Sequence, residues 1–403
     1  MRAGPVAALA LIAAVLGGAL VLAVAKAGGW LHGTSKTVVV RESVPSAGDA
    51  NAPVIAAKPL VGNGFQPAQI YRTRGAGVVT IISYFDSGGL PGARGGQGSG
   101  FVISKDGLIL TSAHVVTTAG QGQGGKAQTA QTIYVEFADG DRVQATPVGV
   151  DLFDDVGVLR VDPKQHSLDP VPLGNSSRVV VGEPVAAIGS PFGNTDSLSV
   201  GVVSATRRSI PSLTTKYDLV DAIQTDAPIN HGNSGGPLFD ARGRVIGINA
   251  QIRSSGSSSG FEGVGFAVPI DSARRSFEQI VKTGSVRYAY VGIKTEDLTP
   301  GVAKKFGYAT KHGALVDYVD PGGAADKAGL KAGDREEVYE GVGVRIGGDA
   351  IVAIDGIPVG SAEDVVRIVA GRLEPGETAR FTVVRGSARR TVPVTLDARP
   401  PAG

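Results

Sequence analysis

Short apolar runs recur through the middle of the chain, and they limit the fold more than any other feature. They read GVVTIISYF, GSGFVISKDGLILTS, TIYVEFADGDRVQATPVGVD, DVGVLRV, EPVAAIGSP, SLSVGVVSAT, RVIGINAQI and VGFAVPI. β-branched residues are frequent in them, and Asp-Gly and other glycine-containing pairs separate them. Such closely spaced strands predict an all-β barrel or sandwich over residues 67–284, rather than β-α-β units.

A helix and then a second domain are expected after these strands. The helix lies in PIDSARRSFEQIVKTG, with Asp271 or Ser272 as its N-cap and Gly284 as its stop. From residue 285 onward, strand-like and helix-like segments alternate, which predicts a compact α+β domain over 285–397. The last six residues, ARPPAG at 398–403, are expected to form a disordered tail.

The N-terminus contains an uncharged apolar run at residues 5–25, between Arg2 and Lys26. At about 1.5 Å per residue, a helix of this length crosses a hydrocarbon core of roughly 30 Å. We expect residues 1–26 to form a cytoplasmic tip and a transmembrane signal anchor, followed by a flexible linker at 27–66. A cleaved signal peptide is the alternative, because Ala-Lys-Ala at 25–27 has the small-x-small pattern. Both interpretations place the rest of the chain outside the cytoplasm.

Charge and cysteine content exclude several classes of function. The formal net charge is +2 and the basic residues do not cluster, so no nucleic-acid partner is expected. The chain has no cysteine, which excludes disulfides, thiolate nucleophiles and cysteine metal sites.

The stretch INHGNSGGPLFD at 229–240 points to a nucleophilic serine, Ser234. A serine hydroxyl needs a base within hydrogen-bonding reach and a group that orients this base. His114 is the best candidate base, because it follows the apolar strand LILTSA and has the small Ala113 beside it. The other four histidines lie in the linker, in a polar loop, in the second domain or in the turn of Ser234 itself: His32, His166, His312 and His231.

The orienting group should be a carboxylate that fixes one tautomer of the imidazole. The segment VDLFDDVGVLRV offers three aspartates. We choose Asp155, because it directly precedes the alternating strand DVGVLRV. Asp154 is expected to face the opposite way, toward solvent, and Asp151 to be a turn residue.

The glycines around Ser234 suggest an oxyanion hole. Such a site needs backbone N–H groups that converge on one point before charge develops there. Gly232 can adopt a positive φ, so its amide and that of Ser234 are the expected donors. Gly235 and Gly236 are expected to leave room for a substrate backbone.

Three motifs, in this order, closely resemble those of the HtrA/Deg (DegP/DegS-like) serine proteases: TSAHVV, DDVGVLRV and QTDAPINHGNSGGPLFD. The likeness covers about residues 69–397, and the N-terminal segment is similar to that of the membrane-anchored bacterial members. The resemblance implies a mainly β fold, in which a chymotrypsin-like double β-barrel precedes a PDZ domain. It assigns His114 as general base, Asp155 as its orienting group and Ser234 as nucleophile, with the amides of Gly232 and Ser234 as the oxyanion hole.

The resemblance also implies partners and regulation. It implies endoproteolysis of unfolded proteins without cofactor or metal, a homotrimer packed through residues 65–71, and switching loops at 86–100, 207–218, 229–233 and 251–262. The YVGI motif would bind the carboxylate of C-terminal peptides through Tyr290, Val291, Gly292 and Ile293, beside the helix at 361–372. The insertion REEVYEGVGVRIGG at 335–348 is expected to form a small hairpin, and its relation to the peptide groove stays open.

Substrate preference and mechanism leave alternatives. The pocket for the residue before the scissile bond should be lined by Ile229, Asn249, Ala250 and Gln251, without an acidic residue, so small or medium aliphatic side chains should be preferred. His231 stands where relatives more often have proline. The competing hypothesis is a PDZ-dependent chaperone or scaffold with a latent protease domain. An α/β-hydrolase esterase is disfavoured, because such enzymes use the order Ser-Asp-His and a G-x-S-x-G motif.

Overall fold

The structure is a computed structural model, and it describes residues 64–85, 95–121, 127–189, 197–230, 232–252 and 263–401. All of these residues belong to one unit of the chain, Lys58–Gly403. The expected anchor at 1–26, nearly all of the expected linker and His231 lie outside the described residues. In the described ranges, no helix is both long and apolar enough to span a bilayer.

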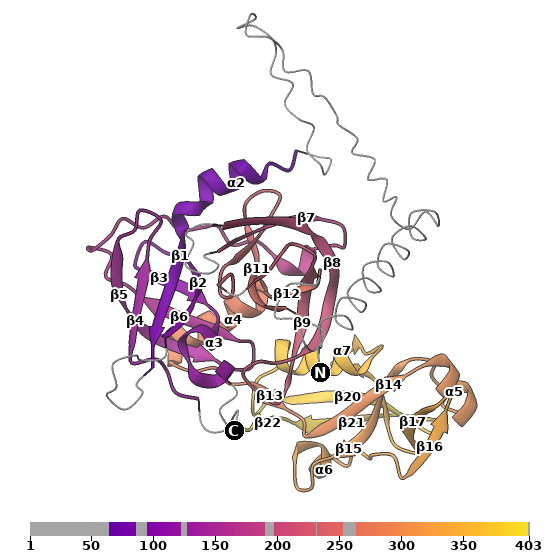
Figure 1. Cartoon of the computed structure of the whole chain (residues 1–403). Helices are drawn as coiled ribbons and strands as arrows, with labels where there is room; N and C mark the ends of the chain where they lie inside the picture. The colour runs from indigo at the N-terminus through magenta and orange to yellow at the C-terminus, as the bar shows by residue number, and fades with distance from the viewer. Residues whose placement is uncertain are drawn as a thin grey trace, which may run out of the picture. The chain divides into compact units, whose positions relative to one another are not determined.

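The first six strands close into an antiparallel barrel, in the order β1-β2-β3-β6-β5-β4 (Figure 1). They are β1 (Val78–Tyr84), β2 (Gly95–Val102), β3 (Leu108–Thr111), β4 (Thr132–Glu136), β5 (Arg142–Asp151) and β6 (Val156–Arg160). Ile81, Val135 and Leu159 are fully buried in its interior. The predicted strands are confirmed here, because the alternating pattern gives each strand one face to bury.

The next six strands form a second closed barrel, in the order β10-β11-β12-β9-β8-β7. They are β7 (Pro184–Gly189), β8 (Ser197–Pro211), β9 (Asp218–Thr225), β10 (Pro237–Asp240), β11 (Val245–Ile252) and β12 (Gly265–Pro269). Strands β9 and β10 were not predicted from the sequence. Asp218 and Asp221 weaken the apolar pattern of β9, and β10 has only four residues, so pairing with neighbouring strands defines both.

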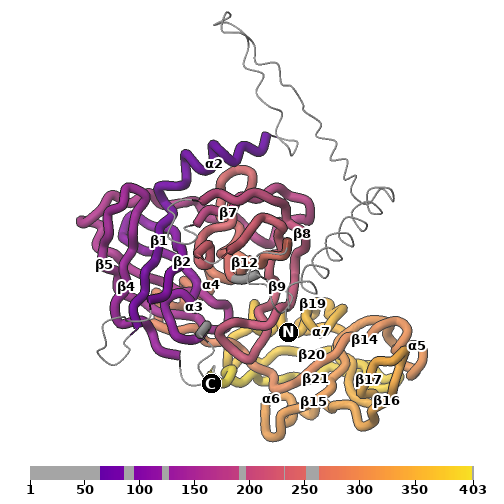
Figure 2. The backbone as a smooth tube through the Cα atoms, viewed as in Figure 1, coloured from indigo at the N-terminus to yellow at the C-terminus, as the bar shows by residue number. Residues whose placement is uncertain are grey.

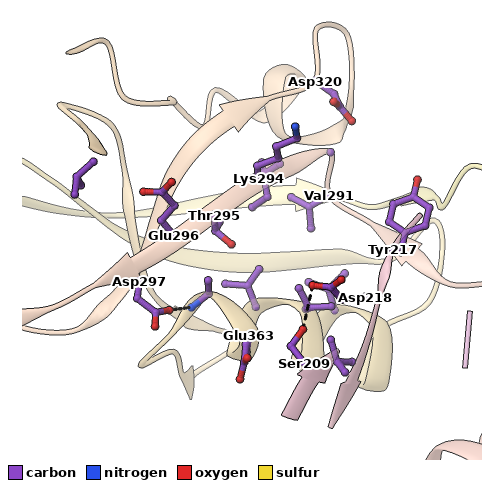
Figure 3. A pocket seen from close by; sticks show the side chains of 18 of the residues that line it. Ser209, Tyr217, Asp218, Val291, Lys294, Thr295, Glu296, Asp297, Asp320 and Glu363 are labelled. Carbon is purple, nitrogen blue, oxygen red and sulfur yellow. Dashed lines mark hydrogen bonds between the residues drawn. The ribbon is translucent and has the colours of Figure 1, made fainter. Parts of the chain in front are cut away.

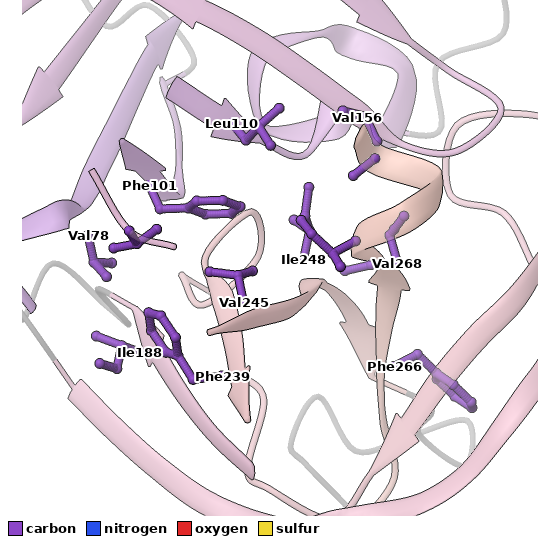
Figure 4. Close-up of a cluster of buried hydrophobic side chains, with 14 of the residues drawn as sticks. Val78, Phe101, Leu110, Val156, Ile188, Phe239, Val245, Ile248, Phe266 and Val268 are labelled. Carbon is purple, nitrogen blue, oxygen red and sulfur yellow. The ribbon is translucent and has the colours of Figure 1, made fainter. Parts of the chain in front are cut away.

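A buried cluster joins the two barrels (Figure 4). Phe101 and Leu110 come from the first barrel, and Ile188, Phe239 and Ile248 come from the second. Burying a side chain of this size contributes about 1.5–3 kcal/mol. The cluster therefore fixes the barrels against each other at the level of the loops that contain the candidate site.

The predicted helix after the barrels is confirmed as α4 (Ile270–Thr283). Its predicted N-cap was wrong: Pro269 occupies that position without a side-chain cap, because β12 runs directly into the helix. Gly284 ends the helix with a φ of 77°, a left-handed conformation that glycine adopts without strain.

The folded part begins earlier than the linker prediction allowed. Phe65 is buried in the cluster between the barrels, and it precedes a helix that was not predicted, α2 (Pro67–Arg74). Only Ile70 of this helix is buried, so the sequence shows no helical apolar stripe. The helix lies near β7 of the second barrel (Figure 2), and Arg74 donates from Nε to the carbonyl of Gly243 at 3.1 Å.

The C-terminal residues form an α+β domain, as predicted. Its sheet has the order β14-β15-β18-β20-β21, with β19 paired to β18, so β14 is an edge strand. The strands are β14 (Ile293–Leu298), β15 (Gly313–Val319), β18 (Ala350–Ile354), β19 (Ile357–Pro358), β20 (Thr378–Arg385) and β21 (Ala388–Thr395). The helices are α5 (Pro300–Phe306), α6 (Ala324–Ala328) and α7 (Ala362–Arg372). The insertion is confirmed as a hairpin of β16 (Arg335–Tyr339) and β17 (Val342–Ile346).

The predicted start of the disordered tail, residue 398, was wrong. Ala398 belongs to a short strand, β22 (Asp397–Ala398), which pairs with β13 (Ala289–Tyr290). The guanidinium of Arg399 lies over the rings of Phe153, Tyr217 and Tyr288, 5.0–5.4 Å from their centroids. Backbone pairing and these cation–π contacts order the start of the tail, and neither leaves an apolar pattern in the sequence.

Candidate active site

His114 lies at the junction of the two barrels, in the short helix α3 (Ala113–Val116) that follows β3. Its ring atom Nδ1 is 2.7 Å from Oδ2 of Asp155, and its backbone N–H donates to Oδ1 of the same carboxylate at 2.9 Å. The His114 side chain is 15% exposed and that of Asp155 is 6% exposed. The carboxylate therefore holds the imidazole in one orientation and favours the tautomer with its proton on Nδ1.

Asp155 has an unusual backbone conformation, with a φ of 52°. Aspartate is one of the few residues with a side chain that tolerate this left-handed region. The carbonyl of Asp155 also accepts a hydrogen bond from Ala113 at 3.2 Å. Three contacts thus attach the end of the β5–β6 connection to the segment that contains His114.

The pKa of His114 reflects two opposing effects. Burial lowers the pKa of the imidazole, but the charge of Asp155 and its hydrogen bond outweigh burial and raise the pKa above the usual 6.5. A proton on Nε2 is therefore held more firmly than on a free histidine.

Ser234 lies in the turn before β10, beside the segment of His114. A Cβ placed on Gly98 would lie 3.0 Å from the Ser234 carbonyl oxygen and 2.6 Å from the side chain of Val115. The Ser234 hydroxyl donates to the carbonyl of Ala250 at 3.1 Å. No hydrogen bond joins it to His114 in the described part of the chain.

The two expected oxyanion donors are the amides of Gly232 and Ser234, in the turn that contains the candidate nucleophile. Gly232 has a φ of 100°, as its predicted role requires. The amides of Gly235 and Gly236 donate to the carbonyls of Asn249 and Asn233. Within the described ranges, the N–H groups of Gly232 and Ser234 meet no acceptor and are available to a ligand.

Ser99 of β2 fixes this turn, and sequence analysis did not identify it. Its hydroxyl donates to the carbonyl of Gly232 at 2.6 Å, and its amide donates to the carbonyl of Ser234 at 2.7 Å. Ser99 is 133 residues from Gly232 along the chain, and nothing local in GSGFV distinguishes it from a turn serine.

Known protein families match both parts of the described chain. Residues 98–248 match the trypsin-like peptidase domain, and residues 289–396 match the PDZ domain. A solved structure, "HtrA-type protease AlgW with tripeptide", is 31% identical in sequence to this chain. The match has a TM-score of 0.67, and it covers 83% of this chain and 98% of that chain. The chain belongs to the HtrA family of serine proteases.

Other relatives extend beyond the region that this chain matches. A "Probable periplasmic serine endoprotease DegP-like" of Ectopseudomonas mendocina is 39% identical over 76% of this chain and 57% of its own length. "Protease Do-like 1, chloroplastic" of Arabidopsis thaliana is 39% identical over 76% of this chain and 64% of its own length. The chain thus spans between half and two thirds of these HtrA relatives.

The glycines after Ser234 do not provide the predicted space for a substrate in this HtrA chain. A Cβ on Gly235 would lie 2.2 Å from the carbonyl oxygen of Ser99, and one on Gly236 would lie 2.6 Å from that of Ile188. Their role is to let the serine turn pack directly against β2 and β7. Glycine motifs alone do not show which neighbour approaches.

Replacing Gly235 with alanine should lower the free energy of unfolding by about 2–5 kcal/mol. A φ of 84° costs an alanine about 1–2 kcal/mol, and overpacking costs about 1–3 kcal/mol more. Urea denaturation followed by circular dichroism measures the change. Gly140→Ala is the matched control, since Gly140 has a φ of 86° and open space around it. Equal losses in the two variants would contradict the packing argument.

Asp154 was predicted wrongly, whereas Asp151 starts the turn as predicted, since its Oδ1 accepts from the amides of Phe153 and Asp154. Asp154 does not face solvent; it is buried and pairs with Arg275 of α4 at 3.0 Å. Asp151 is also buried, and it accepts hydrogen bonds from Ser276 and from the hydroxyl of Tyr288. Burial, with the nearby charge of Asp154, raises the pKa of Asp151 to about 6. Both carboxylates hold the segment of Asp155 against α4 and the start of the PDZ domain.

The residues predicted for the substrate pocket lie mostly in the core. Ile229 is 1% exposed in the interior of the second barrel, and Asn249 and Ala250 are at most 3% exposed. The side chain of Gln251 lies outside the described residues. Of the four predicted pocket residues, Ala250 contacts Ser234, because its carbonyl accepts the hydrogen bond of the Ser234 hydroxyl. The role of the four residues in substrate preference stays a prediction.

A second candidate site lies in the PDZ domain, at the predicted carboxylate-binding loop. The carbonyls of Val291 and Gly292 accept hydrogen bonds from Ala325 and Asp320, at 2.9 and 2.8 Å. Gly292 has a φ of 76°. The N–H groups of Val291 and Gly292 meet no acceptor in the described part of the chain. These orientations leave the two N–H groups available to bind an anion.

Proposed function

We propose that this chain is a membrane-tethered, extracytoplasmic serine endopeptidase that hydrolyses unfolded or damaged proteins. The observation that supports this most is the 2.7 Å contact of His114 with the buried Asp155, beside a serine turn in which two amides meet no acceptor among the described residues. Membership in the HtrA family and the DegP-like relatives agree with such an activity.

In the proposed mechanism, Ser234 Oγ attacks the scissile carbonyl carbon while Nε2 of His114 takes the hydroxyl proton. Asp155 stabilises the imidazolium that forms. The amides of Gly232 and Ser234 donate to the oxyanion of the tetrahedral intermediate. His114 then gives its proton to the leaving amine as the C–N bond breaks, which leaves an acyl-enzyme. A water molecule, deprotonated by His114, releases the acyl group and restores Ser234.

Attack requires a change from the arrangement described. The Ser234 hydroxyl must turn from the carbonyl of Ala250 toward His114. The side-chain oxygens of Asn233 and Asn249 are buried and have no hydrogen-bond donor among the described residues. Such unsatisfied groups are costly, so a rearranged turn that satisfies them is energetically accessible. The hydrogen bond of Ser234 to Ala250, rather than to His114, is that of a latent protease. It therefore also favours the second candidate function, a PDZ-dependent peptide-binding chaperone or scaffold.

Peptide binding to the PDZ domain is the proposed control. The carboxylate of a C-terminal peptide would bind the amides of Val291 and Gly292, with the peptide added as a strand along β14. Lys216 and Tyr217, in the β8–β9 connection, line the same groove. The ring of Tyr217 packs on that of Phe153 at 5.6 Å, two residues before Asp155. This contact gives a physical route from the groove to the catalytic carboxylate.

The proposed assembly involves the N-terminal part of the described chain. A homotrimer would pack through residues 65–71, where Phe65 and Ile70 are already buried within their own chain. The more exposed side chains of this segment would then make the contacts between subunits.

The proposal is tested by two measurements on the full chain. A fluorophosphonate probe should label Ser234, and labelling should rise when a peptide with a free apolar C-terminus is added. Reduced, carboxymethylated lactalbumin should be degraded, whereas the native form should persist. Labelling at another residue would contradict the proposed nucleophile. Peptide binding without hydrolysis under any condition would favour the chaperone function instead.

A further inference from the structure

The groove of the PDZ domain is larger than one strand and one helix would make it. It has a volume of about 1320 Å³ and is bordered by β14 and α7. Residues of the β16–β17 hairpin line it as well, among them Tyr339, Glu340 and Val342. The insertion, whose relation to the groove the sequence left open, therefore contributes to the surface of the groove.

The hairpin is held firmly in this position. Val344 and Ile346 are buried in a cluster with Val302 of α5. A Cβ on Gly301 would lie 2.5 Å from the hydroxyl of Tyr339, so the tyrosine packs directly on the helix backbone. The hairpin and α5 lie side by side at the end of the domain farthest from β13 (Figures 1 and 2). The groove thus has a fixed third side.

Negative charge gathers at the hairpin end of the groove. Glu296 of β14, Glu363 of α7 and Glu340 of the hairpin line it, and none of the three forms an ion pair in the described part of the chain. Asp297 differs, because it accepts a hydrogen bond from the backbone of Ala362 at 2.7 Å. Figure 3 shows Glu296, Asp297 and Glu363 at one end of the groove and Tyr217 at the other.

These glutamates are compensated only in part, because Arg345, whose charge lowers the pKa of Glu296, is itself paired with Asp317 at 3.4 Å. Partial burial raises the pKa of Glu296, and the negative charge of Asp317 raises it further. The lining lysines, Lys216 and Lys294, lie nearer to the carboxylate-binding loop, in the β8–β9 connection and at the start of β14. Asp218 and Asp320 also line the groove at that end, so an excess of one charge is found only at the hairpin end.

Glu340 lies at a turn position where glutamate is an unfavourable residue. It has a φ of 50° and is followed by Gly341 with a φ of 83°, as in a two-residue type I′ turn. Such turns prefer asparagine, aspartate or glycine at this position. A glutamate there costs about 1–2 kcal/mol. Local strain retained at the edge of a groove is typical of a functional residue.

We propose that the groove selects peptides with an apolar, free C-terminus and a lysine or arginine three to five residues before it. This proposal rests on the proposed peptide binding along β14. A peptide paired antiparallel to β14, with its last residue beside Ile293, has its third to fifth preceding residues beside Glu296, Asp297 and Leu298. Basic side chains at these positions would reach Glu296, Glu340 and Glu363.

The test uses fluorescein-labelled decapeptides that end in a free valine and contain lysine, glutamine or glutamate at these three positions. Fluorescence polarisation measures their binding to the full chain with Ser234→Ala, which prevents cleavage. The lysine peptide should bind about five- to tenfold more tightly than the glutamine peptide at low ionic strength, and the difference should shrink in 0.5 M salt. The glutamate peptide should bind most weakly.

Variants then locate the selectivity. Combining Glu296→Gln, Glu340→Asn and Glu363→Gln should reduce the lysine preference to less than twofold, without changing binding of the glutamine peptide. Glu340→Asn suits the turn, so the hairpin should remain folded. Glu337→Gln is the matched control, since Glu337 is exposed on the same hairpin outside the groove, and it should keep the preference.

The two ways of failing are distinguishable. Equal binding of the lysine and glutamine peptides, with both weakened by a C-terminal amide, would overturn the inferred selectivity and leave peptide capture intact. Equally tight binding of peptides with a free C-terminus and with a C-terminal amide would overturn the proposed peptide site itself. A lysine preference that persists in the triple variant would also overturn the assignment of the glutamates.

Discussion

Ser234→Ala should lower the turnover of an unfolded protein substrate roughly 10⁵- to 10⁶-fold and abolish fluorophosphonate labelling. Without the hydroxyl, no acyl-enzyme can form, and only the oxyanion donors and substrate binding remain. The removed oxygen donates a single hydrogen bond, to Ala250, so the folded state should change little. Release of acid-soluble fragments and active-site labelling measure the two effects.

Ser177→Ala is the control for Ser234→Ala, because Ser177 is exposed and bonds only within its own loop and to Asp271. Its activity should equal that of the unaltered protein. Residual labelling of Ser234→Ala at the normal rate would show that another residue is the nucleophile. A loss of circular dichroism signal in Ser234→Ala alone would show that the effect is structural.

Asp155→Asn should lower kcat about 10⁴-fold while the protein stays folded. Asparagine tolerates the φ of 52° at this position as well as aspartate does. Its side-chain amide can donate to Nδ1 of His114, which would place the imidazole proton on Nε2. In that tautomer His114 cannot accept the proton of Ser234, and no negative charge stabilises the imidazolium.

The pH dependence gives a second readout of the same contact. His114 acts as a base only when neutral, and Asp155 raises its pKa above 6.5. Activity of the unaltered protein should therefore fall as the pH decreases, with a midpoint above 6.5. In Asp155→Asn the remaining activity should have its midpoint at a lower pH, because burial then lowers the pKa without an opposing charge.

Asp154→Asn is the matched control for Asp155→Asn. Asp154 is adjacent and buried, but its partner is Arg275 rather than His114. This variant should lose stability and keep its kcat within about tenfold, since uncompensated burial of one ion costs folding energy. Equal losses of kcat in the two variants would contradict the assignment of Asp155 as the orienting group.

Local pattern was enough to predict most of the strands, the hairpin insertion and the end of α4 at Gly284. Alternating residues and turn glycines act over a few positions, so the sequence shows them directly. Strands β9 and β10, helix α2 and the pairing of Ala398 were missed. Their stability comes from distant neighbours rather than from their own apolar pattern.

The candidate site also combines features that the sequence predicts with features that only distant contacts determine. The sequence by itself determined which residues have suitable chemistry: a serine in a glycine turn, a histidine after a strand, and three aspartates before the next strand. Only the tertiary structure decided their partners. His114 and Asp155 are 41 residues apart, Asp154 turns to Arg275, and Gly235 packs on Ser99. Such contacts depend on the barrels closing against each other, and no local pattern records them.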